Sequence, residues 1–407
     1  MNWREIQLGD AIHVKHGFAF KGEHFSHDGT YLVLTPGNFN EEGGFRLRPG
    51  KDRFYTGDIP EDYILSEGDL IVAMTEQGPG LLGSSALIPE DDKYLHNQRL
   101  GLIRDVDDSR LNKNFLYYLF NTRSVRGQIK GSASGTKVRH TAPERIYRIR
   151  ALVPSEIAEQ RKIASILSAY DDLIENNRRR IQLLEQAARL LYKEWFVHLR
   201  FPGHEHVKII DGVPEGWNEG IISDFYFTAS GGTPSRKNPD FFTGDIPWVK
   251  TQELTGGFIL GSEEKITEDA IKSSSAKFFP RHTVLVAMYG ATIGQTAILS
   301  VPSTTNQASC ALIPRAHGAN YAHVYLFLMH HKTDLVGLGQ GAAQNNISQK
   351  VIKAFKMILP TKALLDAFSE SACPIFEQIE ALQRTNVGLT QARDILLPRL
   401  MNGEITV

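Results

Sequence analysis

The chain has 407 residues, of which 42% are hydrophobic and 22% are charged, which excludes a disordered or collagen-like protein and suffices for two ordinary domains. Its 45 Lys and Arg residues against 46 Asp and Glu residues give a net charge of -1, so any surface that attracts a polyanion must be local. The chain has only two cysteines and no apolar N-terminal segment, which predicts a reduced, cytoplasmic protein. No apolar run approaches the roughly 20 residues needed to cross a bilayer, so we expect no membrane association.

The sequence contains one internal repeat. The apolar run at 70–74 resembles the run at 284–288, which lies 214 residues later. Towards the end of the repeat, residues 151–154 resemble residues 357–360, which lie 206 residues later. The falling offset predicts a diverged duplication whose second copy has shorter loops.

Each copy is predicted to contain a globular part and a long helix. In residues 1–154 and 204–360, short apolar runs alternate with Gly, Pro, Asn and Asp clusters, which is typical of an α+β domain with small strands. Residues 155–203 and 361–407 carry apolar residues in a heptad pattern, which predicts a central and a C-terminal spacer helix.

The heptad stripes predict how the two helices pair. A period of 3.5 residues suits a helical partner, so we expect an antiparallel coiled coil with one globular domain at each end. The alternative is that each amphipathic helix packs on its own domain. A first helix of roughly 36 residues at about 1.5 Å per residue would be about 54 Å long, against about 34 to 36 Å per turn of B-DNA. The polar seam positions are expected to set register, and the predicted interface comprises Ile163, Leu167, Ile174, Asn177, Ile181, Leu184, Leu191, Ile379, Leu382, Asn386, Leu389 and Leu396.

A local basic segment points to a polyanion. Between residues 123 and 150 only Glu144 is acidic. The small polar loop 131–137 could bring backbone N–H groups close to phosphates, and the corresponding loop of the second copy, 339–348, carries amides that can pair with adenine. The basic residues of the segment are Arg123, Arg126, Lys130, Lys137, Arg139, Arg145, Arg148 and Arg150.

Catalytic motifs are weak. Asp240, Glu263 and Lys265 fit a short nuclease pattern, but acidic residues beside the start of a helix at 266–271 explain Glu263 better. Gly337 to Ala342 fits a loose dinucleotide motif, but the helical pattern before it replaces the strand that such a site requires. The His204 and His330 clusters lack further ligands at a metal-site spacing. We therefore predict no catalytic residue, bound cofactor or metal ion in this chain.

In their order along the chain, several short segments together resemble one known family, the specificity subunits of type I restriction-modification systems. Each segment is weak alone, but the resemblance covers the whole chain, and the duplicated order is specific. The segments are 17–21 (GFAFK), 231–235 (GGTPS), 246–249 (IPWV), 290–294 (GATIG), 346–348 (NIS), 154–163, 191–196 (LYKEWF) and 396–405 (LLPRLMNGEI).

The resemblance implies a function without catalysis. Such subunits carry two target recognition domains, each recognising one half of a bipartite, asymmetric DNA sequence, and two antiparallel helices that space them. It implies double-stranded DNA, two adenine-N6 methyltransferase subunits and motor-nuclease restriction subunits as partners, with S-adenosylmethionine and Mg-ATP as cofactors of those partners. Two departures are that the second helix lacks the Glu-Gln pair of 159–160, and that residues 140–142 (HTA) stand where 346–348 are NIS.

We therefore predict a DNA-recognising scaffold, with half-site centres about one to one and a half turns apart. A single-chain nuclease and a coiled-coil assembly protein without nucleic acid are the alternatives. The residues expected to contact DNA are Lys21, Gln77, Arg99, Lys137, Arg139 and His140 in the first domain, and Arg236, Lys237, Lys250, Tyr289, Gln344 and Asn345 in the second.

Overall fold

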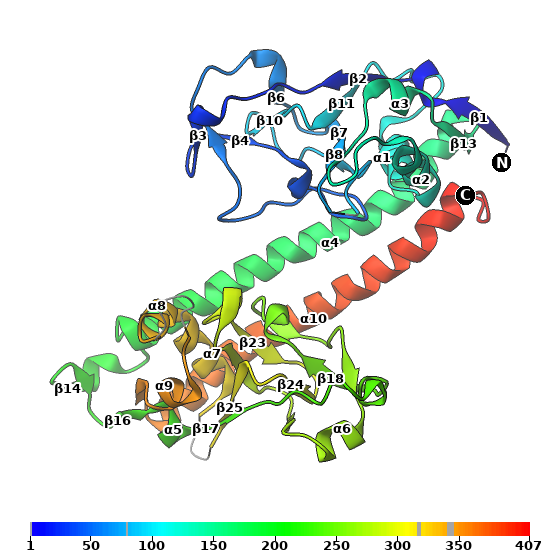
Figure 1. Ribbon diagram of the computed structural model, residues 1–407. Coiled ribbons are helices and arrows are strands. Elements are labelled where there is room, and N and C mark those ends of the chain that lie inside the picture. The colour runs from blue at the N-terminus through cyan, green and yellow to red at the C-terminus, as the bar shows by residue number, and fades with distance from the viewer. Residues whose placement is uncertain (1, 79, 316–318, 340–345) are drawn as a thin grey trace. The chain divides into compact units, whose positions relative to one another are not determined.

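The computed structural model describes residues 2–78, 80–315, 319–339 and 346–407 (Figure 1). The chain forms two compact units: unit 1 comprises residues 1–173 and 389–407, and unit 2 comprises residues 174–388. Within the described residues, no helix combines the length and the apolar character needed to cross a membrane.

Unit 1 is built around a four-stranded antiparallel sheet in the order β2-β11-β7-β9. A second sheet has the order β3-β5-β4-β10-β6, and the pairs β1–β13 and β8–β12 complete the strands. The strands are β1 (Trp3–Gln7), β2 (His13–His16), β3 (Phe25–Ser26), β4 (Tyr31–Val33), β5 (Phe54–Tyr55), β6 (Ile64–Leu65), β7 (Leu70–Ala73), β8 (Thr75–Glu76), β9 (Ser85–Leu87), β10 (Tyr94–Leu95), β11 (Leu100–Arg104), β12 (Arg139–His140) and β13 (Arg150–Pro154). The short helices are α1 (Lys113–Phe120), α2 (Arg123–Ser132) and α3 (Pro143–Tyr147).

Unit 2 has a five-stranded sheet in the order β17-β25-β22-β23-β19 and a four-stranded sheet in the order β20-β18-β24-β21. The pairs β14–β15 and β16–β26 lie outside these sheets. The strands are β14 (Ile209–Ile210), β15 (Val213–Pro214), β16 (Asn218–Ile221), β17 (Tyr226–Ser230), β18 (Ile246–Val249), β19 (Phe258–Ile259), β20 (Lys265–Ile266), β21 (Phe278–Phe279), β22 (Val284–Ala287), β23 (Thr296–Leu299), β24 (Ser303–Thr305), β25 (Ser309–Pro314) and β26 (Lys356–Leu359). The helices are α5 (Ile222–Phe225), α6 (Glu268–Lys272), α7 (Tyr321–His330), α8 (Lys332–Gly337) and α9 (Gln349–Lys353).

The two units share one topology, which confirms the predicted repeat and the α+β class. The order β2-β11-β7-β9 corresponds to β17-β25-β22-β23, and the terminal pair β1–β13 corresponds to β16–β26. Both units share a parallel strand pair, β4 with β10 and β18 with β24, and unit 2 has a second parallel pair, β19 with β23. The corresponding helices α1 and α7 also begin in the same way, because a side-chain oxygen of Asn112 caps α1 and one of Asn320 caps α7.

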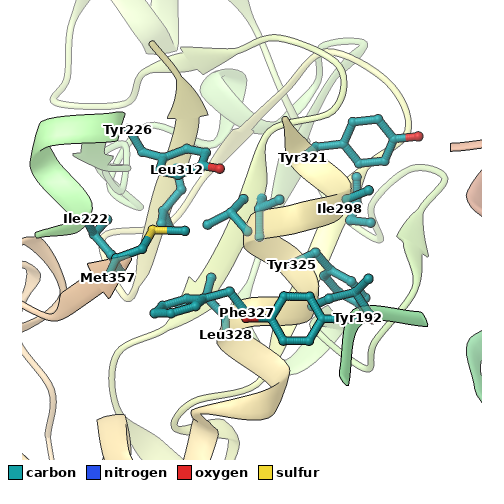
Figure 2. Close-up of a cluster of buried hydrophobic side chains, with 14 of the residues drawn as sticks. Tyr192, Ile222, Tyr226, Ile298, Leu312, Tyr321, Tyr325, Phe327, Leu328 and Met357 are labelled. Carbon is teal, nitrogen blue, oxygen red and sulfur yellow. The ribbon is translucent and has the colours of Figure 1, made fainter. Parts of the chain in front are cut away.

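The apolar runs detected in the sequence form the central strands. All residues of β7 and β22 are buried, because both faces of each sheet are covered. In unit 2, residues of β17, β25 and β26 pack with the hydrophobic side of α7 into one core (Figure 2). That core includes Tyr226, Leu312, Met357, Tyr325 and Phe327.

Two long helices run through the chain, α4 (Ile157–Tyr192, 36 residues), which continues into a π-helical turn at Lys193–Val197, and α10 (Lys362–Met401, 40 residues). Within unit 1, the beginning of α4 packs with the end of α10, and Arg393 Nη1 lies 2.6 Å from Asp171 Oδ1. Within unit 2, the end of α4 packs with the beginning of α10, and the rings of Trp195 and Phe368 are 5.6 Å apart. The predicted antiparallel pairing is confirmed in each unit.

Candidate nucleic-acid interface

In unit 1, one end of the four-stranded sheet gathers several loops. Gly101 of β11 lies opposite His16 of β2 and Val72 of β7, and both pairings are antiparallel. The C-terminal ends of β2 and β7 therefore lie beside the N-terminal end of β11. We call this end of the sheet, with the loops 17–21, 74–78, 97–99 and 134–140, the edge of unit 1.

Backbone hydrogen bonds hold these loops together. Phe18 N donates to His96 O at 2.9 Å, and Met74 N donates to Arg99 O at 2.9 Å. Thr141 N donates to Met74 O at 2.9 Å, which places β12 beside the end of β7. The structure thus brings all six residues predicted to contact DNA in the first domain to loops of one edge.

A glycine is required where the first of these loops meets the sheet. A Cβ atom on Gly17 would lie 2.0 Å from Asn97 O, and a Cβ atom on Gly231 of unit 2 would lie 2.1 Å from Thr305 O. Both distances are shorter than any van der Waals contact, so only glycine permits this approach of two backbones. The repeat therefore keeps the same loop junction in both units.

Five of the six predicted side chains are exposed at this edge. Within the described residues, none of the five side chains has a hydrogen bond or an ion pair. They supply cations, an amide and an imidazole, which are the groups that proteins use on phosphates and base edges. The five are Lys21, Gln77, Arg99, Lys137 and His140.

Arg139, the sixth, is half-buried and contacts other parts of unit 1. Its Nη1 lies 3.7 Å from Glu76 Oε1, and its Nη2 donates to Lys130 O at the end of α2. The Glu76 carboxylate is buried and accepts hydrogen bonds from Gly80 N at 3.1 Å and Leu82 N at 2.8 Å. Glu76 therefore orders the loop that carries Gln77, a role that no sequence motif indicated.

The loop 134–140 is a tight turn. Ser134 and His140 exchange two backbone hydrogen bonds, Ser134 N to His140 O at 3.0 Å and His140 N to Ser134 O at 2.8 Å. Gly135 has a φ of +93°, which disfavours any other residue there. The turn presents Thr136 and Lys137 to solvent.

The predicted basic patch is only partly a free positive surface. Arg126 is buried and donates to Leu82 O at 3.1 Å, Glu41 O at 2.7 Å and Gly80 O, and burial lowers its pKa. Arg145 Nη1 donates to His140 O at 3.1 Å. The expectation that Arg126 belongs to an open phosphate-binding patch was wrong, because its buried guanidinium satisfies carbonyl oxygens of the loops instead.

Unit 2 has a corresponding edge. Gly232 N donates to Thr305 O at 2.9 Å, Met288 N donates to Ala308 O at 2.8 Å, and Ile347 N donates to Met288 O at 2.8 Å. These bonds match the three of unit 1. In addition, Asn306 N donates to Val249 O at 3.0 Å, so the chain preceding β25 also meets the end of β18. The predicted residues Arg236, Lys237, Lys250 and Tyr289 lie on these loops. Gln344 and Asn345 lie outside the described residues.

Arg236 is anchored within unit 2. Its Nη1 lies 2.5 Å from Glu264 Oε2, and its guanidinium lies over the rings of Phe242 and Trp248 at 4.1 and 5.1 Å from their centroids. The hydrogen bond from Arg236 lowers the pKa of the Glu264 carboxyl below its usual value. This ion pair and the stacking orient the loop after β17.

Lys250 is also paired. Its Nζ lies 2.9 Å from Glu263 Oε2 and 3.0 Å from Glu264 Oε1, and 19% of its side chain is exposed. Hydrogen bonds to Glu263 and then Glu264 raise the pKa of the Lys250 ammonium. Lys237 and Tyr289, by contrast, are exposed, and neither side chain has a hydrogen bond or an ion pair within the described ranges.

A surface pocket of about 440 Å³ opens at the edge of unit 2, and we call it the edge pocket. It lies where β17 and β22 end and where Asn346 pairs with Tyr289 through a backbone bridge. Its lining combines hydroxyl and amide groups with an apolar floor. The lining residues are Ser230, Met288, Tyr289, Asn346, Ile347, Ser348, Gln349 and Val351.

The residues of the nuclease alternative do not form a metal site. Glu263 is paired with Lys250, and Asp240 and Lys265 are exposed on separate elements. In the part of the chain that the structure describes, no three His, Cys, Asp or Glu residues lie close enough to hold a metal ion. The helix expected at 266–271 is present as α6, but it begins at Glu268 after its cap Thr267, and Ile266 ends β20 instead.

Comparison with known proteins agrees with this geometry. The family model described as "Type I restriction modification DNA specificity domain" matches residues 1–186 and 214–363. The chain is 27% identical over 299 residues to the type I restriction enzyme MjaIX specificity subunit of Methanocaldococcus jannaschii, covering 72% of this chain and 69% of that protein. It is 28% identical over 311 residues to the HindI specificity subunit of Haemophilus influenzae, covering 60% and 67%.

The fold is also similar to that of a solved structure. The S subunit of a type I restriction-modification system from M. genitalium superposes with a TM-score of 0.63 at 17% identity, over 98% of this chain and 96% of that chain.

Proposed function

The chain belongs to the family of type I restriction-modification DNA specificity subunits, and from this premise we propose that the edge of each unit recognises one half of a bipartite, asymmetric site in double-stranded DNA. Specificity subunits are non-catalytic recognition proteins, and this role fits the pairing of Glu263 with Lys250 rather than with Asp240 or Lys265. The family match favours this function over a single-chain nuclease and over a coiled-coil assembly protein without nucleic acid.

The main support for the proposal is that the edges of the two units share one backbone arrangement but present different side chains. Thr75 and His140 lie opposite each other in unit 1, and Tyr289 and Asn346 lie opposite each other at the same place in unit 2. A shared frame would present each set to DNA in the same way. Different side chains on it would select different bases, as an asymmetric target requires.

Phosphate and base contacts would be divided among the exposed residues. Lys21, Arg99 and Lys137 of unit 1 and Lys237 of unit 2 would contact phosphates and set the register of the protein on the duplex. Gln77 and the residues beside it would contact base edges. Arg139, Arg236 and Lys250 would act mainly by fixing the loops, because acidic partners already compensate their charges.

The long helices offer surfaces for protein partners. In unit 2, Leu183 and Leu190 of α4 are 64% and 61% exposed, and they lie one heptad apart on one face. In unit 1, Ile395 of α10 is 57% exposed. Repeated exposed apolar side chains mark interaction surfaces, so we assign these faces to the docking of two adenine-N6 methyltransferase subunits and, in a full complex, of motor-nuclease subunits. S-adenosylmethionine and Mg-ATP would bind those partners.

The test is methylome sequencing of a host that expresses this chain with candidate type I methyltransferase subunits, against the same host without this chain. We expect one bipartite N6-methyladenine motif that is present only with the chain. An active methyltransferase whose methylation pattern does not change when the chain is removed would contradict the proposal.

A further inference from the structure

The edge pocket of unit 2 has a fixed floor. Ser230 Oγ donates to Gln349 Oε1 at 3.2 Å, and Gln349 Nε2 donates to Thr228 Oγ1 at 3.4 Å, so both ends of the Gln349 amide are held. Met288 and Ile347 are buried beneath it, at 6% and 1% exposure. A ligand would therefore meet a preformed apolar and hydroxyl surface.

Two free polar groups stand at the mouth of the pocket. Asn346 and Tyr289 face each other across their backbone bridge, and both are exposed. Within the described residues, neither side chain makes a hydrogen bond. The Asn346 amide offers one donor and one acceptor in a plane, which no group of the pocket satisfies.

Unit 1 differs at the corresponding place. Thr75, His140 and Arg145 occupy the positions of Tyr289, Asn346 and Val351, as the matching strand and helix starts show. Arg145 Nη1 donates to His140 O at 3.1 Å and to Ser134 Oγ at 3.0 Å, so a guanidinium lies where unit 2 has a valine. The two edges therefore have the same backbone arrangement but differ in the side chains at the place of the edge pocket.

We propose that the edge pocket receives the major-groove edge of one adenine in the DNA half-site of unit 2, and that Asn346 selects it. This inference rests on the proposed function and names a base and a residue for it. Adenine presents the N7 acceptor beside the N6 donor, which match the amide of Asn346, whereas guanine presents two acceptors and would oppose its oxygen. Met288, Ile347 and Val351 provide the apolar surface for the C5 methyl group of the paired thymine.

The experiment uses the complex of this chain with its methyltransferase subunit and the half-sites defined by the methylome of the wild type. We expect Asn346→Ala to weaken binding about 5- to 150-fold at one adenine of one half-site, which is the range for one lost bidentate contact. The other half-site and the gap should not change. Asn346→Asp, which keeps the shape of the side chain but has only acceptors, should shift the preference at that position towards cytosine.

Base-analogue DNA and a matched control complete the test. Placing 7-deazaadenine at that position removes the N7 acceptor, so it should weaken binding by the wild type and have no further effect on Asn346→Ala. Asn218→Ala, an exposed asparagine of β16, is the control and should leave the motif unchanged.

The outcomes separate the two proposals. If the wild type gives no chain-dependent motif, the proposed function fails. If the wild type gives a motif and Asn346→Ala keeps full discrimination at every adenine, only the assignment of the edge pocket is overturned.

Discussion

At the scale of single residues, buried charged side chains have a different role from exposed ones. Glu76 accepts hydrogen bonds from two backbone amides and lies beside Arg139, whereas Lys137 is exposed on a turn. Sequence reasoning identified the exposed cations because their chemistry is visible in composition. It missed Glu76, because no motif marks a carboxylate that accepts from the loop following it. It misassigned Arg126, because the burial of Arg126 depends on contacts with residues more than 40 positions away in the chain.

Replacing Glu76 by alanine should destabilise the fold. The Gly80 and Leu82 amides would lose their acceptor in a buried site, at a cost of about 1–3 kcal/mol for each unsatisfied group. Urea unfolding monitored by tryptophan fluorescence measures the loss. Glu67→Ala, an exposed carboxylate of the same unit, is the matched control, and equal unfolding midpoints for the two variants would refute the role of Glu76.

Two buried histidines predict a loss of stability in acid. Burial lowers the pKa of His323 to about 3 and that of His96 to about 4. The unfolded chain binds a proton at each histidine near a pKa of about 6.5, so stability is full above that value and falls as the pH drops towards the folded pKa. At pH 5 each histidine should reduce the free energy of unfolding by about 2 kcal/mol relative to pH 7.5.

The variant His323→Phe tests this prediction in unit 2. The ring of His323 lies among Tyr192, Phe196 and Phe368, so an aromatic replacement keeps those contacts without the titrating group. The difference in unfolding free energy between pH 7.5 and pH 5 should shrink by about 2 kcal/mol. Exposed His206→Phe should leave that difference unchanged, and an unchanged difference in His323→Phe would show that this histidine is not responsible.

At the scale of elements, the polar residues of the helical seam have partners. Asn177 Nδ2 donates to Asn386 Oδ1 at 2.9 Å, and Asn386 Nδ2 donates to Ile174 O at 3.4 Å. Arg393, one heptad after Asn386, pairs with Asp171, which also accepts a hydrogen bond from Tyr118 Oη at 2.7 Å. The heptad pattern identified the residues between the two helices. The partner of each polar residue depends on the register between α4 and α10, which lie far apart in the sequence.

The asparagine pair should show a strong energetic coupling. Asn386→Leu alone leaves the buried Asn177 amide without its partner and should cost about 1–3 kcal/mol, whereas the double change to leucine should be nearly neutral. A double-mutant cycle of unfolding free energies measures the coupling. Additive effects of the two single changes would mean that the hydrogen bond does not couple the helices.

The attachment of each long helix to its unit could not be predicted. The fully buried Gln160 accepts a hydrogen bond from Asn112 N at 2.8 Å and donates to Arg110 O and Pro154 O. Unit 2 lacks this glutamine and instead has Asn320 Nδ2 donating to Ser369 Oγ at 2.7 Å. The missing Glu-Gln pair of the second helix therefore reflects a different internal attachment.

At the scale of the whole molecule, the repeat was evident in the sequence because strand-forming runs and chain offsets survive divergence. The target bases were not evident, because they depend on which side chains face the groove and on how the DNA deforms. Domain boundaries at 154 and 360 remain predictions, since α4 and α10 each contribute to both units.

The lengths of the two helices should determine the gap between the half-sites. Inserting one heptad into α4 and one into α10 at matching places keeps the seam in phase and lengthens each helix by about 10.5 Å. The non-specific gap of the methylated motif should then grow while both half-sites keep their bases. A functional variant with an unchanged gap would refute the spacing role of the helices.

The most direct test of the central claim, that each unit recognises its own half of the target, is the methylome of a variant changed only at the edge of unit 1. Gln77→Ala combined with His140→Ala alters exposed side chains and leaves the edge pocket of unit 2 intact. We predict that one half of the bipartite motif loses base discrimination while the other half and the gap stay as in the wild type. Loss of discrimination in both halves, or in neither, would contradict the account.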